Sequence, residues 1–334
     1  MNPQPPRQTR PHWILASRVL VVSVVALTLL SLSRYYGLIF PIELLSHFQL
    51  QYFATTLILG GLLSAIARRW LIYVAVACLG IQLIPILPWY VPLSDATPLT
   101  HGYALRVLSV NVNAQNHHYQ ETIQLVQAEQ PDIAIFIEAD DAWIQQLQSL
   151  DDLFPYAAQQ PDSYNRGVAV YSRTPLSNTS AEPWGTDQES SVVTTVAIAN
   201  QSVRLIAVHP PPPIRSSLLH IRNRQLNEIQ QYLMESDPPF IVAGDFNITM
   251  WSPFYQRLIQ TMPLKNTRRG IGLLPTWPVD AAFPQTGTLI YPFVQIPIDH
   301  CLVSPTIQVK AMRTGHPVGS DHLPIIVDLW VPLS

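Results

Sequence analysis

The sequence predicts an α+β sandwich preceded by an N-terminal transmembrane helical anchor, and three observations support this. Long apolar stretches fill the first 92 residues, and 20 of the 22 acidic residues follow residue 101. Short apolar runs bounded by turn residues dominate the rest of the chain, a pattern typical of strands buried on both faces. Helical patterns are fewer than these strands and do not alternate strictly with them, which favours an α+β sandwich over a doubly wound parallel sheet.

Composition excludes two broad classes of protein. Hydrophobic residues make up 48% of the 334 residues and charged residues 12%, about half the usual charged fraction of roughly 25%. This balance excludes a disordered chain and a strongly basic nucleic-acid module. The residues after position 101 include 13 basic and 20 acidic side chains, a formal charge of −7. The two cysteines, Cys78 and Cys301, cannot form a disulfide framework and do not fix the compartment.

Residues 1–92 are predicted to form a membrane anchor with three transmembrane helices, at about 13–32, 52–67 and 70–91. A helix that crosses a bilayer needs about 20 apolar residues, which the first and third stretches supply. The second stretch is short and contains Gly60-Gly61, so a re-entrant or interfacial segment is the alternative. A cleavable signal peptide fits poorly, because the first stretch is long and further apolar stretches follow it.

Basic residues between these stretches predict the orientation of the anchor. Arg7, Arg10 and Arg68-Arg69 lie on one side of the three spans, and Arg34 alone lies on the other. Because cytoplasmic loops are enriched in Lys and Arg, we expect a multi-pass cell-membrane protein with a cytoplasmic N-terminus and an extracytoplasmic globular domain. If the second stretch does not cross the membrane, the domain faces the cytoplasm instead.

The globular domain is predicted to span residues 105–334, after a short linker at 93–104. Its buried strands are predicted at Leu105–Val110, Ile133–Ile137, Val203–Val208, Phe240–Ala243, Val294–Cys301 and Leu323–Val327. Amphipathic periodicity predicts two helices, at Tyr119–Gln130 and Ser217–Glu235.

Four of these strands end in a residue that can hydrogen-bond or bind a metal, namely Asn111, Glu138, His209 and Asp245. One such residue is usually a turn-former, but a carboxylate beside buried strands costs on the order of several kcal/mol unless it is paired or binds a metal. Four of them converging on a sheet edge therefore indicate a functional site. The donors are hard oxygens and imidazole without thiolate, which suits Mg²⁺ or Mn²⁺ better than zinc.

Five short motifs follow one another along the domain. They are Ser109-Val110-Asn111, Glu138 after its apolar strand, Gly244-Asp245-Phe246-Asn247, Ile298-Asp299-His300 and Ser320-Asp321-His322. Their order resembles that in the endonuclease/exonuclease/phosphatase superfamily, which includes pancreatic-type deoxyribonucleases, apurinic-site endonucleases, inositol polyphosphate phosphatases and neutral sphingomyelinases. The resemblance covers residues 105–334 and implies a four-layer sandwich, in which helices flank two mostly antiparallel β-sheets.

Further motifs lie between these five. They are His209 followed by four prolines, Arg224-Gln225-Leu226, Trp251-Ser252-Pro253, Pro275-Thr276-Trp277-Pro278 and Gly319 before the last motif. In these the chain is similar to the bacterial membrane-anchored branch of the superfamily, which includes teicoplanin-resistance-type membrane proteins. In that branch a short transmembrane bundle precedes the catalytic domain.

The resemblance implies a role for each residue of the motifs. Glu138 is expected to be the main ligand of Mg²⁺ (or Mn²⁺), with Asn111 beside it and Asp321 nearby. The other expected roles are catalytic.

Five residues are expected to be catalytic by the same resemblance. Asp245 is expected to hold or activate the attacking water, and Asn247 and His209 to contact the phosphate. His322 is expected to contact the phosphate or take the proton of the water, with Asp299 fixing its tautomer. We therefore expect the Asp299 carboxylate within hydrogen-bond distance of a His322 ring nitrogen.

Three further features carry weaker expectations. Arg222 lies on the apolar face of its predicted helix, where it either covers apolar surface with its stem or reaches a phosphate or an active-site carboxylate. Trp277 either lines a substrate groove or packs near the site. Arg268-Arg269 is the one compact basic pair of the globular domain and is better placed for a lipid headgroup or polyanion than for specificity.

Together these features predict a membrane-anchored, divalent-metal-dependent phosphoesterase that hydrolyses a phosphodiester, phosphomonoester or pyrophosphate by direct water attack. The anchor raises the local concentration of lipid headgroups, which favours a lipid-linked substrate. A nuclease acting on DNA or RNA is the alternative, although the charge of −7 and the presence of only two lysines in the domain disfavour it. A catalytically inactive binding protein on the same fold is the second alternative.

Overall fold

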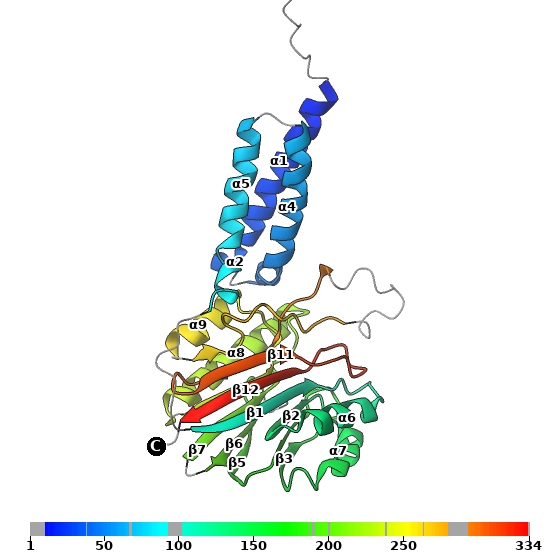
Figure 1. The fold of residues 1–334 in the computed structure, drawn as a ribbon, viewed down its shortest axis with the longest axis vertical. Coiled ribbons are helices and arrows are strands. Elements are labelled where there is room, and N and C mark those ends of the chain that lie inside the picture. The colour runs from blue at the N-terminus through cyan, green and yellow to red at the C-terminus, as the bar shows by residue number, and fades with distance from the viewer. Residues whose placement is uncertain are drawn as a thin grey trace, which may run out of the picture.

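The computed structural model describes residues 11–37, 39–66, 69–92, 102–186, 188, 191–199, 201–237, 239–262, 264–279 and 293–332. A bundle of helices stands on a larger domain that contains two β-sheets (Figure 1). Most of the predicted linker lies outside the described residues, and the domain begins with strand β1 at Gly102.

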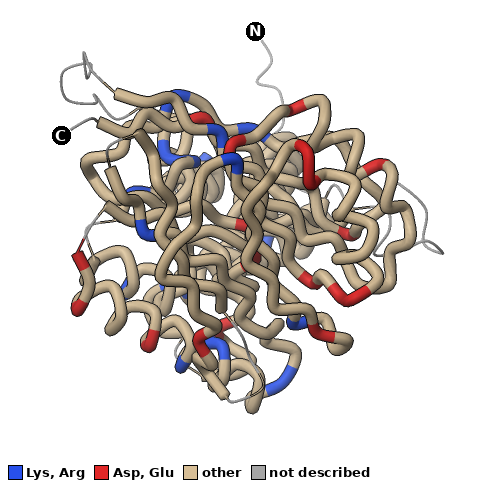
Figure 2. Tube along the Cα trace, turned by 90° about the horizontal axis from the view of Figure 1, so that it is seen from below, with Lys and Arg blue, Asp and Glu red and all other residues tan. Residues whose placement is uncertain are grey.

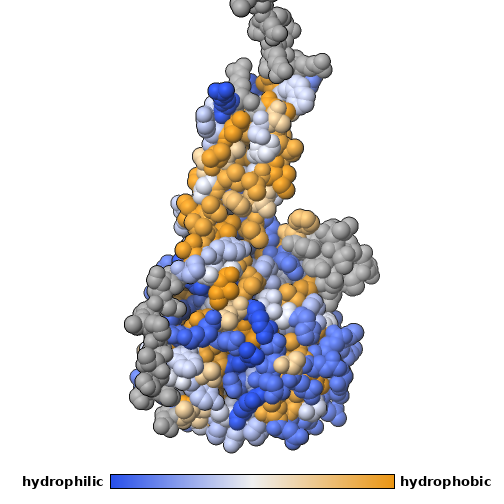
Figure 3. All heavy atoms as spheres, in the orientation of Figure 1, coloured by the Kyte–Doolittle hydropathy of each residue, from blue (hydrophilic) through white to orange (hydrophobic). Residues whose placement is uncertain are grey.

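Among the described residues, three long helices form the bundle and contact one another: α1 (Pro11–Ser31), α4 (Gln49–Ile66) and α5 (Arg69–Leu83). Two short helices, α2 (Ser33–Tyr36) and α3 (Ile42–Leu45), form the hairpin between α1 and α4. A 3₁₀ turn, η1 (Leu87–Trp89), follows α5. Hydrophobic side chains cover the visible face of the bundle (Figure 3), as a helix surrounded by lipid requires.

The three predicted membrane stretches are helical, but their ends differ from the expected ones. By length and composition, the described residues hold two helical segments that can cross a membrane, His12–Tyr36 with 25 residues and Gln49–Ile66 with 18. Helix α5 has 15 residues and ends at Leu83, short of position 91. Pro85 and Pro88 follow it, and proline cannot continue a helix. That these helices cross a membrane remains a prediction.

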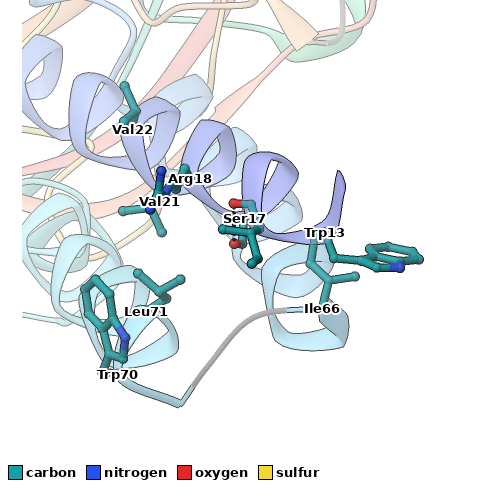
Figure 4. A pocket seen from close by; sticks show the side chains of 9 residues that line it. Trp13, Ser17, Arg18, Val21, Val22, Ile66, Trp70 and Leu71 are labelled. Atoms are coloured by element: carbon teal, nitrogen blue, oxygen red, sulfur yellow. Dashed lines mark hydrogen bonds between the residues drawn. The ribbon is translucent and has the colours of Figure 1, made fainter. Parts of the chain in front are cut away.

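The end of the bundle that lies away from the domain contains a cavity of about 560 Å³. Figure 4 shows its lining, which includes Trp13 and Arg18 from α1 and Trp70 from α5. Trp13 and Trp70 are 46% and 59% exposed. Tryptophan is enriched where a transmembrane helix meets the membrane surface, so this end has the composition of a membrane–water interface.

The strands described in the domain form two six-stranded sheets. The first has the order β11-β12-β1-β2-β4-β3 and the second β5-β6-β7-β8-β10-β9. Within each sheet one neighbouring pair is parallel, β1 with β2 and β7 with β8, and the other pairs are antiparallel. The first sheet contains β1 (Gly102–Asn111), β2 (Ile133–Ile137), β3 (Tyr156–Gln160), β4 (Val168–Ser172), β11 (Gln308–Thr314) and β12 (Ile325–Pro332). The second contains β5 (Leu176–Glu182), β6 (Ser191–Ile198), β7 (Gln201–Val208), β8 (Phe240–Asp245), β9 (Lys265–Asn266) and β10 (Asp299–Val303).

Apolar side chains bind these layers together. One buried cluster lies between the sheets, with Val107 and Ile135 from the first sheet and Leu205 and Ile241 from the second. A second cluster joins the outer face of the second sheet to α8 (Ser216–Met234) and α9 (Pro253–Thr261). A third joins the first sheet to α6 (Tyr119–Glu129), α7 (Asp141–Leu147) and the 3₁₀ turn η2 (Gln148–Leu150). This arrangement confirms the predicted α+β fold of two mostly antiparallel sheets flanked by helices.

Two predicted strands are displaced along the chain. The strand expected at Val294–Cys301 is formed at Asp299–Val303, and the one expected at Leu323–Val327 begins at Ile325. Pro297 and Pro324 lie just before the observed strands. Because proline has no backbone N–H for a strand ladder, each strand begins after its proline.

The hairpin between α1 and α4 is joined to the domain by buried polar contacts. The Glu43 carboxylate, fully buried, accepts a hydrogen bond from the Ser252 hydroxyl (2.6 Å) and pairs with the equally buried Arg222 guanidinium (3.0 Å). His47 lies beside Glu43 (3.4 Å) and bonds the Thr249 hydroxyl (2.9 Å). Because buried charges need partners, these contacts fix the hairpin against α8 and the segment before α9.

A second connection lies after α5. The Trp251 indole donates to the Pro85 carbonyl (2.9 Å), and Ile86 and Trp89 are buried in the same apolar cluster as α8 and α9. Gln51 at the start of α4 adds a hydrogen bond to the Gln295 carbonyl (2.9 Å). The anchor and the domain therefore share one hydrophobic core at their junction.

Candidate active site

The site lies where the two parallel strand pairs end. Asn111 and Asp245 are the last residues of β1 and β8, and Glu138 and His209 directly follow β2 and β7. The carboxyl ends of parallel neighbours lie at the same edge of a sheet, so each pair delivers two of these side chains together. The two sheets face each other across their common core, which brings the two pairs into one group.

Unusual backbone geometry helps to aim these side chains. Gly244 has φ +142°, and a Cβ there would lie 2.0 Å from the Val208 carbonyl oxygen, so only glycine lets β8 approach β7 this closely. Glu138 and Asn247 have φ of 63° and 48°, in the left-handed region. Such conformations cost on the order of 1–3 kcal/mol and cluster at functional sites.

Asn111 joins the acidic residues of the two sheets. Its amide nitrogen donates to the Glu138 carboxylate (3.0 Å) and to the Asp245 carboxylate (3.2 Å). Its amide oxygen accepts from the backbone N–H of Asn113 (3.0 Å). In this arrangement Asn111 positions the two carboxylates, and its oxygen faces Asn113.

His209 and Asn247 flank Asp245. The Nε2 atom of His209 lies 3.7 Å from a carboxylate oxygen of both Glu138 and Asp245. The Asn247 backbone N–H donates to Asp245 (2.8 Å), and its side-chain amide donates to the Pro210 carbonyl (3.0 Å). The four strand-end residues expected to converge, Asn111, Glu138, His209 and Asp245, therefore lie together in the structure.

Asp299 and His322 form the expected pair. The His322 Nδ1–H donates to an Asp299 carboxylate oxygen at 2.9 Å, which confirms the prediction of hydrogen-bond distance. Asp299 is paired in register with Asp245 across β10 and β8. The other ring nitrogen of His322 consequently lies 3.6 Å from Asp245.

Further hydrogen bonds hold Asp299 and His322 in place. The Thr276 hydroxyl accepts from the Asp299 backbone N–H (3.3 Å), and the Ser320 hydroxyl accepts from that of His322 (3.1 Å). The Arg268 guanidinium, fully buried, donates to the Asp299 carbonyl (2.9 Å). This role of Arg268 could not be predicted from the sequence, because a basic pair alone does not show which of its two members is buried.

Asp321 lies at the rim of the group and is held by two donors. The Asn113 amide donates to one carboxylate oxygen (2.9 Å) and the Trp277 indole to the other (3.1 Å). The centroids of the Trp277 and His322 rings lie 6.5 Å apart, so Trp277 is adjacent to the site. Asn113 was missed from the sequence, although it lies two residues after Asn111 and could have been found from that spacing.

Arg222 is not part of this group. Its side chain is completely buried, and it pairs with Glu43 and donates to the Asn247 carbonyl (3.2 Å). The expectation that it binds substrate is therefore corrected: it supports the Asn247 backbone from behind. The carboxylate that it reaches belongs to the anchor and not to the active site.

Burial and mutual charge shift the ionisation of the group. Burial, with Asp299 and Glu138 nearby, raises the pKa of Asp245 to about 8, and burial also raises the pKa of Glu138. Burial lowers the pKa of His322, but Asp299 and Asp245 outweigh it and raise that pKa to about 10. His322 in turn holds the Asp299 pKa below its usual value in spite of burial. Burial lowers the pKa of His209 to about 4. A neutral imidazole, His209, and a cationic one, His322, therefore both face the Asp245 carboxylate.

Comparison with known proteins decides the family. Residues 108–322 match the model of the Endonuclease/Exonuclease/phosphatase family. The chain belongs to this family. As an endonuclease/exonuclease/phosphatase protein it is a hydrolase of phosphate esters. A search of curated protein sequences found no match.

Solved structures share the endonuclease/exonuclease/phosphatase fold with this chain. An endonuclease/exonuclease/phosphatase protein from Beutenbergia cavernae DSM 12333 is 20% identical, with a TM-score of 0.53, over 69% of this chain and 72% of that one. D. rerio TDP2, complexed with a single-strand DNA product, is 17% identical, with a TM-score of 0.57, over 68% and 98%. Sphingomyelinase C from Streptomyces griseocarneus is 16% identical, with a TM-score of 0.50, over 68% and 99%.

Endonuclease/exonuclease/phosphatase enzymes generally use a divalent metal ion, and the residues present fit one. Ligand atoms of the buried residues Asp245, Asp299 and His322 lie within 4.8 Å of one another, and the Asn111 amide connects Asp245 to the Glu138 carboxylate (3.2 and 3.0 Å). Glu138 and Asp321 bring the number of carboxylates to four, against one cationic imidazole among the described site residues. A hard divalent cation would balance this excess of negative charge.

Proposed function

We propose that the chain is a membrane-anchored phosphoesterase that uses Mg²⁺ or Mn²⁺ and hydrolyses its substrate by direct water attack. The observation that supports it most is the buried arrangement in which Asp299 holds His322 and His322 faces Asp245. This is the geometry of a group that moves a proton and binds a phosphate oxygen. The described site residues include no cysteine or serine placed as a nucleophile beside His322 or His209.

The site residues have different roles in the proposed reaction. Glu138 would be the main ligand of the metal ion, with Asn111 and Asp321 close to it, and the ion would supply charge neutralisation at the phosphate. Asp245 orients the attacking water and accepts its proton, because its carboxylate is buried and its pKa lies near neutrality.

The phosphate is held by donors from both sheets. Asp299 accepts the Nδ1 proton of His322 and helps to raise its pKa to about 10, so the ring is an imidazolium whose Nε2–H can also donate to a phosphate oxygen. His209 and Asn247 also lie beside Asp245 and would supply further donors. Such donors stabilise the charge that develops on the phosphate without repelling the water.

The substrate class that we favour is a lipid-linked phosphoester or pyrophosphate. A phosphate polymer requires a basic surface, but acidic and basic residues are interspersed over the domain (Figure 2). A bundle of apolar helices embedded in a bilayer would hold the site near lipid headgroups, which supports this substrate class. Nucleic acid is the second candidate, because the structurally similar TDP2 was solved with a single-strand DNA product.

The location is proposed on the same basis. Three helices with the basic residues of the sequence mainly at one end favour a multi-pass membrane protein whose catalytic domain is extracytoplasmic. Reporter fusions after Leu99 test it: activity of cytoplasmic reporters only would overturn this orientation.

The experiment that tests the function uses the full chain in lipid nanodiscs. Hydrolysis of a phospholipid, a polyprenyl pyrophosphate and single- and double-stranded DNA is measured with Mg²⁺ and with chelator. We expect Mg²⁺-dependent turnover of a lipid-linked substrate, loss of at least 10²-fold in H322A, and normal rates in the exposed control H117A. Faster turnover of DNA would establish the nuclease, and an unaffected H322A would reject this site.

A further inference from the structure

A second cavity lies outside the active site, where α2 of the anchor meets α9 of the domain (Figure 1). Its volume is about 520 Å³, within the roughly 300–1,000 Å³ of small-molecule sites. The side chains that matter here are three arginines and three aromatic residues, namely Arg34, Arg257, Arg269, Tyr35, Trp89 and Trp251. Both units of the chain thus contribute to one pocket.

The lining carries positive charge without its usual partner. No aspartate or glutamate is among the described residues that line the cavity. Arg34, Arg257 and Arg269 take part in none of the ion pairs found within the described ranges. One arginine from the anchor and two from the domain thus bring three positive charges to one pocket whose described lining holds no carboxylate.

Arg34 is the most informative of the three. It is 8% exposed, and its guanidinium donates to the Ser31 hydroxyl (2.9 Å), the Gln49 side-chain oxygen (3.2 Å) and the Tyr35 hydroxyl (3.1 Å). All these acceptors are neutral, so the charge is held in place but not balanced. A buried cation without a counter-charge is costly, and an anionic ligand removes that cost.

The other two arginines are exposed and are supported by aromatic rings. The Arg269 guanidinium lies 5.4 Å from the centre of the Trp89 ring, and that of Arg257 lies 5.7 Å from the Phe254 ring. Stacking leaves the N–H donors at the guanidinium edge free for a ligand. An adjoining cavity lined by Lys265, Arg269 and Lys310 extends the positive surface.

The place of the pocket identifies the anion. It lies at the ends of α1 and α5, where the apolar bundle gives way to the domain. Tyr35, Tyr36 and Tyr90 are more than half exposed at this level, as aromatic residues are at a membrane surface. Lipid phosphates lie at this depth, and the arginine fork matches phosphate oxygens.

We propose that this pocket binds the phosphate headgroup of an anionic phospholipid, separately from the catalytic site. The inference rests on the proposed membrane anchoring, but it does not require the proposed reaction. Arg34 contacts one side of the phosphate from the anchor, and Arg257 and Arg269 contact the other side from the domain. The bound lipid thus bridges the two units of the chain.

The test is a titration of the full chain, delipidated in detergent, with phosphatidylglycerol and with phosphatidylcholine, followed by native mass spectrometry. We expect tighter binding of phosphatidylglycerol, and a tenfold to hundredfold weaker affinity in R257Q/R269Q. The matched control is R166Q/R313Q, which removes two arginines elsewhere on the domain that are paired with Asp162 and Glu129. Both substituted pocket arginines are exposed, so folding is preserved.

Three results would overturn the proposal. Equal affinity for the two lipids would show that the pocket does not select an anionic headgroup. Equal loss in the control would indicate a diffuse charge effect. Displacement of phosphatidylglycerol by inorganic phosphate at similar concentration would identify free phosphate as the ligand. H322A, tested in parallel, keeps lipid binding even if hydrolysis is absent, so failure of the proposed reaction is distinguished from failure of this site.

Discussion

Replacing Glu43 by alanine removes the carboxylate through which the anchor hairpin enters the domain. Glu43 and Arg222 have completely buried side chains, with 3.0 Å between the guanidinium and the carboxylate. The alanine leaves Arg222 charged inside the protein with the Asn223 side chain and the Asn247 carbonyl as acceptors. The Ser252 hydroxyl also loses its 2.6 Å acceptor.

The expected loss of stability follows from these contacts. Removal of one partner of a buried ion pair costs about 3–5 kcal/mol, and the lost hydrogen bond of Ser252 adds about 1 kcal/mol. For a domain of this size 1 kcal/mol corresponds to about 2–4 °C in Tm, so E43A should melt at least about 8 °C below the wild type. The apolar double replacement E43L/R222M leaves no unpaired charge and should recover most of this loss.

Thermal unfolding of the full chain in one detergent measures the effect. The matched control is the exposed pair of Arg313 and Glu129, whose neutralisation in R313Q should change the free energy of unfolding by about 1 kcal/mol or less. If E43A and R313Q lose the same small amount, or if E43L/R222M is less stable than E43A, the buried pair does not join anchor and domain as argued.

Three further predictions concern the site and the junction. The hydrolysis rate should fall to a similar residual value in Asp299→Asn, in His322→Ala and in the double variant, because residues that act through one proton path lose activity non-additively. If the two losses multiply in the double variant, the two residues act independently. Activity should vanish with chelator, and E138Q should weaken Mg²⁺ binding measured by calorimetry far more than the exposed control E121Q; unchanged Mg²⁺ binding in E138Q would remove it from the ligand set. The pKa of Glu43 is lowered to about 2, because His47, Arg222 and Ser252 outweigh the effect of burial. Because folding favours the ionised carboxylate, Glu43 stabilises the fold fully at pH values above its unfolded pKa near 4.5. This stabilisation is lost as the pH falls toward 2. The Tm advantage of wild type over E43Q should therefore shrink between pH 6 and pH 3, and a constant difference would contradict this assignment.

Much of the site could be predicted because its residues follow strands. Each of these predicted strands is an apolar run that ends in a polar residue, so the local pattern shows both the strand and its functional side chain. These residues are Asn111, Glu138, His209 and Asp245. Helices α6 and α8 were predicted within one residue at each end, because their amphipathic periodicity is long enough to detect. Helix α9 was missed, although Ser252 caps it and Pro253 occupies its first turn, a recognisable start signal.

The remaining features depend on contacts between distant segments. The left-handed conformation of Glu138 cannot be expected from its residue type, since glutamate rarely adopts it. The partner of Arg222 lies 179 positions earlier in the chain, in a segment interpreted only as an anchor. Glu43 itself was a usable signal, because it is one of two acidic residues before position 101 and such a residue in an apolar segment needs a partner.

The two attachments at the junction prevent the catalytic domain from rotating relative to the helical bundle. The hairpin between α1 and α4 and the turn after α5 both rest on α8 and α9 or the segment before α9, so rotation of the domain would have to break Glu43–Arg222 and Trp251–Pro85 together. The active site therefore keeps a fixed distance from the bundle and a fixed orientation relative to the helix axes. If the helices cross a bilayer as proposed, this fixed height would favour substrates whose phosphate protrudes from the membrane by a matching distance.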